Sequence, residues 1–85
     1  MNNFISYHLV KAIADFAIFL KFTSEESLNA DASMEAMEQL AGELQRMDDE
    51  LRINLACQLR KMSTEYGELR KARFIENLPE SLGLL

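Results

Sequence analysis

The stretch FISYHLVKAIADFAIFLKF, residues 4–22, decides the fold of this chain. It carries four of the five phenylalanines, and its only charges are Lys11, Asp15 and Lys21. Apolar residues recur there at the three- and four-residue steps of a helix. One face of that helix consists of Ile5, Leu9, Ile13, Phe16 and Leu20, extended to one side by Tyr7, Val10, Ala14 and Ala17. A helix this apolar needs cover on more than one side, so we expect it at the apolar centre of the molecule.

The same stretch is nearly long enough to cross a membrane, which takes about 20 apolar residues. Lys11 and Asp15 lie near its middle, however, and each would cost about 2.5–3.5 kcal/mol at the bilayer centre. A secretory signal is not expected either, because no basic segment precedes the apolar run and no small-residue cleavage site follows it. We therefore expect a cytoplasmic protein with no membrane partner.

The length of 85 residues predicts a single helical domain over 1–85 with a modest core, for which oligomerisation is an option. Hydrophobic residues make up 48% of the chain, which argues against disorder. A single cysteine, Cys57, excludes an internal disulfide, and a lone cysteine is usually a buried packing residue. His8 falls on the polar wedge of the first helix, where we expect it at the surface.

A polar stretch over 23–33 predicts a loop, and an amphipathic helix is expected over 32–47. Its apolar side consists of Met34, Met37, Leu40, Ala41, Leu44 and Met47. Asp48 is suited to be the N-cap of a third helix over 49–66, with two more acids in its first turn. Because no strong helix breaker separates the two segments, one rod over 32–66 stays open, although the short chain favours an antiparallel hairpin.

The third helix has the strongest periodicity in the chain. Its predicted core face consists of Leu51, Leu55, Leu59, Met62 and Tyr66, with Ile53 and Cys57 almost opposite. Gly67 is the expected helix end, followed by a short basic helix over 68–77 that Pro79 should stop. The last residues include three leucines and are expected to fold back onto the core. The fold class is therefore all-α, a small bundle of about four helices.

The net charge of −5 is unevenly distributed. Residues 24–50 hold nine acids and one base, whereas residues 51–85 hold six bases and four acids. An acidic band disfavours binding to nucleic acid, which relies on basic patches, and suits a basic protein partner. The three glycines are isolated, and no Cys or His pair has the spacing of a metal site. We therefore expect no metal, no cofactor and no enzymatic activity.

Small size, acidity and helical character resemble the small acidic immunity proteins of bacterial toxin systems, delivered by type VI or contact-dependent secretion. The resemblance is carried by SMEAMEQLAGELQRMDDEL at 33–51 and FIENLPESLGLL at 74–85. It implies an inhibitor or antitoxin that covers the active site of a cognate toxin. Exposed acidic groups steer association with a basic site. The expected partner-binding residues are Glu35, Glu38, Glu43, Asp48, Asp49 and Glu50.

A second interpretation uses the surplus apolar surface of the first helix. In this case the chain is a structural, adaptor or chaperone-like module, and its partner is a second copy in a homodimer or another protein. Phe4, Phe19 and Phe22 then form the apolar interface, and the acidic band serves only solubility. The sequence leaves both interpretations open.

Overall fold

The computed structural model describes residues 4–26 and 30–85, and their regular structure is helical. The helices are α1 (Tyr7–Glu26), α2 (Ala30–Gln45), α3 (Asp49–Met62), the 3₁₀ turn η1 (Ser63–Glu65) and α4 (Leu69–Ser81). The predicted all-α bundle of four helices is confirmed. None of the helices in the described part of the chain is long and apolar enough to cross a membrane.

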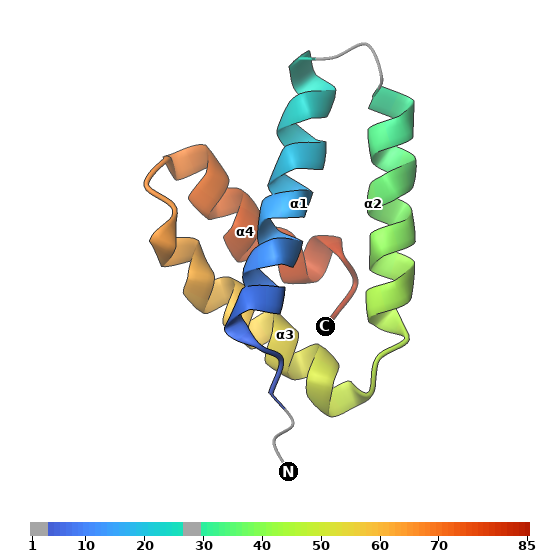
Figure 1. Cartoon of the computed structure of the whole chain (residues 1–85), viewed down its shortest axis with the longest axis vertical. Helices are drawn as coiled ribbons and strands as arrows, with labels where there is room; N and C mark the ends of the chain where they lie inside the picture. Colours follow the sequence, from blue (N-terminus) through green and yellow to red (C-terminus); the bar gives the residue numbers. More distant parts are fainter. Residues whose placement is uncertain (1–3, 27–29) are drawn as a thin grey trace.

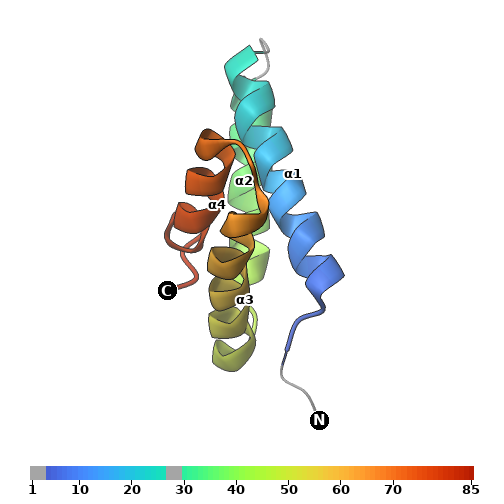
Figure 2. The same ribbon diagram turned by 90° about the vertical axis from the view of Figure 1, so that its left-hand side faces the viewer.

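The four helices form two packed pairs. α1 and α2 run antiparallel side by side, and α3 crosses behind the lower part of α1 (Figure 1). α4 returns along α3, and both contact α1. In the view turned by 90°, α1 lies at one edge of the molecule, and α3 and α4 lie towards the opposite edge (Figure 2). α1 is therefore covered from behind and from the side, and its remaining side faces outward.

The core is built where α1, α3, α4 and the C-terminal residues meet. Its fully buried side chains are Val10, Ala14, Ala17, Leu55, Ala56, Leu59, Met62, Ile75, Leu78, Leu82 and Leu84. The predicted core stripe of the third helix is confirmed at Leu55, Leu59 and Met62, which are buried, whereas Leu51 and Tyr66 are half-buried and Tyr66 lies beyond the end of α3. Within α2, over residues 30–45, no side chain is fully buried, so this helix lies against the core without entering it.

The buried face of α1 is not the face that holds its largest side chains. The core contains Val10, Ala14 and Ala17, which were expected at the side of the predicted face. Leu9 and Phe16, from the middle of that face, are exposed instead. Small side chains let the backbone of α1 approach α3 and α4 closely. This packing turns the buried face towards the alanines and leaves Leu9 and Phe16 outside. Of the predicted face, Leu20 is buried and Ile5 and Ile13 are half-buried against the core.

Several helix boundaries differ from those expected. α1 continues to Glu26, through part of the predicted loop, and residues 27–29 lie outside the described part of the chain. α3 ends at Met62 and passes into η1, four residues earlier than expected, so Gly67 lies in the connection to α4. α2 and α3 are separate helices with a break at 46–48, so the continuous rod is excluded. Their apolar faces do not meet as a hairpin, because α2 packs on α1 and α3 packs on α4.

Pro79 does not stop the fourth helix, as was expected, but lies buried inside α4. In the last turn a proline removes one hydrogen bond, to the carbonyl of Ile75, and its ring is accommodated in the core. The helix ends instead at Gly83, which has φ of 69°. The Gly83 N–H donates to the Glu80 carbonyl (3.0 Å), and the Leu84 N–H donates to the Pro79 carbonyl (2.9 Å). This pair of bonds is a Schellman motif. It places Leu82 and Leu84 in the core, as predicted, whereas Leu85 stays exposed.

Candidate protein-binding surfaces

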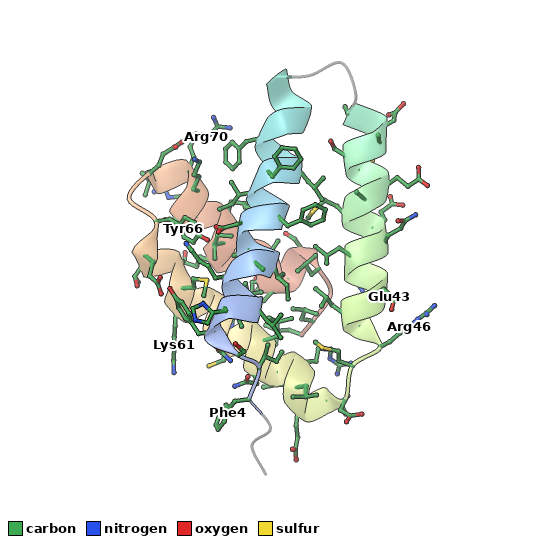
Figure 3. All side chains as sticks on the ribbon, in the orientation of Figure 1. Phe4, Glu43, Arg46, Lys61, Tyr66 and Arg70 are labelled. Carbon is green, nitrogen blue, oxygen red and sulfur yellow. The ribbon has the colours of Figure 1, made fainter. Side chains whose placement is uncertain are left out.

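The acidic side chains of α2 lie on its outer side. Glu35, Glu38 and Glu43 are all exposed, whereas the half-buried Met37 and Leu40 pack towards the core. Glu43 and Arg46 project away from α1 (Figure 3), and they approach each other at 3.5 Å between Oε1 and Nη1. Since both groups are well exposed, this pair contributes little to stability. The outer face of α2 therefore presents negative charge that is not needed for the fold.

The acidic surface continues into the turn between α2 and α3. Asp48, Asp49 and Glu50 are exposed there, and they line a shallow hollow together with Met47 and Leu51. Asp48 holds the N-cap position of α3 as predicted, but its side chain makes no capping hydrogen bond. The Asp49 carboxylate accepts a hydrogen bond from Arg52 at 2.9 Å. We call six of the exposed acids of α2 and of this turn the acidic surface: Glu35, Glu38, Glu43, Asp48, Asp49 and Glu50.

The expected apolar residues do not form one patch. Phe22 is half-buried within its own domain, where its ring meets the edge of Phe74 at 6.0 Å and the guanidinium of Arg70 at 4.9 Å. Phe4 is exposed near the lower end of α1 (Figure 3), beside a hollow that includes Ile53 and Cys57 of α3. Phe19 is exposed in the second half of α1. The three phenylalanines thus lie in three different surroundings.

Sequence reasoning missed the exposed residues that do accompany Phe19. Leu9 and Phe16 of α1 are 60% and 47% exposed, and Phe19 is 60% exposed. The signal was present in the sequence, because α1 is apolar almost all round and a single domain of this size cannot cover every side. The sequence did not show which side of α1 is buried, because that depends on how α3 and α4 pack.

Two tyrosines tie α1 to the segment after α3. The Tyr66 hydroxyl donates to Asp15 at 2.7 Å, and Lys11 lies 4.2 Å from the centre of the Tyr66 ring (Figure 3). The Tyr7 hydroxyl donates to Glu65 at 2.5 Å. Burial, followed by the hydrogen bond to Asp15, raises the pKa of the Tyr66 phenol above its ordinary value. The hydrogen bond to Glu65 likewise raises the pKa of the Tyr7 phenol.

The two phenols thus donate hydrogen bonds that join separate elements of the fold. These hydrogen bonds join residues more than fifty positions apart, Tyr66 to Asp15 and Tyr7 to Glu65. No local pattern in the sequence predicts such contacts. The segment before α1 is tied down in the same way. Asn54 accepts from the Ile5 N–H at 2.9 Å, and Gln58 donates to the Ile5 carbonyl at 2.7 Å.

The remaining residues considered from the sequence are at the surface. His8 is exposed, as expected, and its ring meets the edge of Tyr7 at 5.5 Å. Cys57 is exposed as well, so the expectation of a buried packing residue is wrong. The physical reason is its position on α3, opposite the buried Leu55 and Leu59. Over residues 4–26 and 30–85, no three His, Cys, Asp or Glu side chains come together as a group that could hold a metal ion.

No protein-family model, no curated protein and no solved structure matches this chain. The function is therefore argued from the two surfaces described above and from the contacts that hold them in place.

Proposed function

We propose that this chain is a protein-binding inhibitor that neutralises a basic partner protein by covering it with the acidic surface of α2 and of the turn that follows. The resemblance to small acidic immunity proteins suggests a bacterial toxin as that partner and the cytoplasm as the place of action. The observation that carries the proposal is the outward placement of all six acids along one continuous stretch of the chain.

The structure makes the acidic surface available for binding. Because α2 has no fully buried side chain, its outer face can adapt to a partner without disturbing the core. Glu43 pairs with Arg46 and Asp49 pairs with Arg52, each three residues away, at an exposed surface where a partner's basic groups can compete. Clustered charge of one sign raises association rates by about 10- to 1000-fold. These properties suit a protein that must capture its partner quickly.

We favour binding over catalysis because several polar side chains are engaged in contacts that join elements of the fold. Tyr7 and Tyr66 are held in hydrogen bonds to Glu65 and Asp15, which join elements of the fold. Arg60 of α3 is paired with Glu80 of α4 in the same way. The hollow at the turn between α2 and α3 is shallow, and its acids Asp48, Asp49 and Glu50 lie beside the apolar Met47 and Leu51.

The first test is co-expression with the product of the neighbouring gene, together with a viability assay of that product alone. We expect the neighbouring product to be toxic, the toxicity to be cancelled by this chain, and the two proteins to co-purify. A neighbouring product that is harmless and does not co-purify would argue against an inhibitor of that product.

The second test locates the binding surface by charge reversal. The double variant E35K/E38K reverses two exposed acids of α2, and E68K/E76K reverses the exposed N-cap acid and one exposed acid of α4. Each Glu→Lys change adds two charges, so both variants move the net charge from −5 to −1. We expect E35K/E38K to slow association and weaken its dependence on salt, while the matched variant binds nearly as the native chain. Equal effects of the two variants would show that the acidic surface is not the contact site.

A further inference from the structure

The exposed apolar residues of α1 follow the spacing of a coiled-coil seam. Leu9, Ala12, Phe16 and Phe19 are separated by three, four and three residues, and all four are exposed. These are the a and d positions of a heptad repeat, which place side chains in one line along a helix. We call these four residues the α1 seam. In Figure 2 α1 forms one edge of the molecule, and no other helix lies beyond it.

The α1 seam lies apart from the contacts that α1 makes within its own domain. The core face of α1 holds Val10, Ala14 and Ala17, which are completely buried. A helix that is apolar on a second side needs further cover, and isolated exposed residues would not recur at heptad steps. The seam is thus an unpartnered apolar face with a regular spacing along the helix.

The order of side chains along the seam is complementary to itself. When two copies pair in antiparallel orientation about a two-fold axis at the level of Ala14, Leu9 of one copy lies opposite Phe19 of the other. In the same register, the small Ala12 lies opposite the large Phe16. An antiparallel coiled coil brings a positions opposite d positions, and each layer here joins a smaller side chain to a phenylalanine. Parallel pairing would instead place Phe16 against Phe16 and leave a gap at Ala12.

The exposed area is close to what a dimer requires. Aromatic side chains offer about 150–250 Å² each, so the seam leaves roughly 300 Å² of apolar surface per copy. One side of a standard interface buries about 800 Å², of which about 450 Å² is apolar. α2 runs beside α1 and holds only incompletely buried apolar side chains, which supply further area.

We propose that a second copy of this chain covers the α1 seam, with the two α1 helices antiparallel. The inference does not depend on the proposed inhibitory function, because it uses α1 alone. It also differs from the interface expected from the sequence, since Phe22 packs internally and Phe4 lies elsewhere. Of the three phenylalanines expected at the interface, only Phe19 belongs to the α1 seam. The other members of the seam are Leu9, Ala12 and Phe16.

The oligomeric state tests the proposal directly. Sedimentation velocity over a micromolar concentration series should show a monomer–dimer equilibrium for the native chain. F19E places a charge in the seam, while F4E is a matched control, because Phe4 and Phe19 are 67% and 60% exposed. In a two-fold dimer each seam contact occurs twice, so F19E removes two contacts and should raise the dimer dissociation constant by about 100-fold or more. F4E should leave the dissociation constant near the native value. A native chain that stays monomeric, or equal effects of F19E and F4E, would overturn the proposal.

The orientation is tested by disulfide trapping in a C57S background, which removes the native exposed thiol. A mixture of L9C and F19C chains should form a covalent heterodimer on mild oxidation, because opposed seam positions bring their Cβ atoms within disulfide range. L9C alone should link poorly, since the two copies of position 9 would be about 15 Å apart along the helix axis. Efficient L9C homodimers without the mixed product would refute the antiparallel register.

Discussion

Replacing Gly83 with alanine is expected to destabilise the whole domain, although the change adds only one carbon atom. Gly83 ends α4 with φ of 69°, a left-handed conformation that residues with a Cβ rarely adopt. A Cβ built on Gly83 would lie 2.6 Å from Nε2 of Gln45, the last residue of α2. That amide donates to the Leu82 carbonyl at 2.8 Å. The substitution therefore affects both the end of α4 and the contact that joins it to α2.

The expected cost has two parts. Holding alanine in a left-handed conformation costs about 1–2 kcal/mol. The Gln45 side chain can swing away from the new Cβ, so the collision costs its hydrogen bond, about 0.5–1.5 kcal/mol, rather than a shift of the backbone. Together G83A should lower the free energy of unfolding by about 1.5–3.5 kcal/mol, which for a domain of this size lowers Tm by about 6–28 °C.

Urea and thermal unfolding followed by circular dichroism measure this change, and Gly42 supplies a control. Gly42 lies within α2, where nothing comes within 4 Å of an added Cβ. G42A should therefore stabilise the chain by about 0.5–1 kcal/mol through helix propensity. The same chemical change thus has opposite signs at the two glycines.

A double-mutant cycle with Q45A separates the two parts of the cost. In the Q45A background, G83A should cost only the conformational part, about 1–2 kcal/mol. A G83A variant as stable as the native chain would refute the Schellman cap as the reason for glycine at this position. An unchanged cost in the Q45A background would remove the role assigned to the contact with α2.

Two further predictions concern Tyr66 and Cys57. Y66F removes the hydrogen bond to Asp15 and should lower stability by about 0.5–1.5 kcal/mol in urea unfolding at neutral pH. The raised pKa of Tyr66 also predicts that stability falls as the pH rises above about 10, because the unfolded phenol ionises there while the folded phenol keeps its proton. Y66F should flatten that fall, and an identical alkaline profile would contradict the assignment. Cys57, being exposed, should react with a thiol reagent in the native protein as fast as in urea, and protection in the native state would show that the thiol is covered.

The parts of the fold that the sequence predicts well are those with one clear apolar stripe. The longest apolar stripe of α3 includes Leu55, Leu59 and Met62, and Ile53 and Cys57 on the opposite side are exposed, so the stripe indicates the buried face before any partner is known. The return of the last leucines was predicted from composition, and the structure gives its cause in the cap at Gly83. Where a helix has only one side that can be buried, local pattern is sufficient.

The buried face of α1 could not be predicted in this way, because α1 has several apolar sides. The face with the largest side chains looked like the core face, but packing depends on the shape of the neighbouring helices as well as on hydrophobicity. Ala14 and Ala17 allow close approach, whereas Phe16 would hold α3 and α4 apart. Pro79 has a similar explanation: it removes one hydrogen bond, to the carbonyl of Ile75, but its ring is buried in the core, and that burial depends on tertiary packing rather than on the local sequence.

The two proposed surfaces lie on different sides of the chain, and this has a consequence for stoichiometry. Glu43 and Arg46 point away from α1 (Figure 3), so covering the α1 seam with a second copy leaves the acidic surface of each chain accessible. A dimer would then bind two partners, one per chain, and F19E would convert a complex of two chains and two partners into one of each without loss of affinity per chain. Light scattering on the purified complex distinguishes these assemblies. If F19E instead abolished partner binding, the α1 seam itself would contact the partner, and the acidic surface would contribute steering rather than the principal contact.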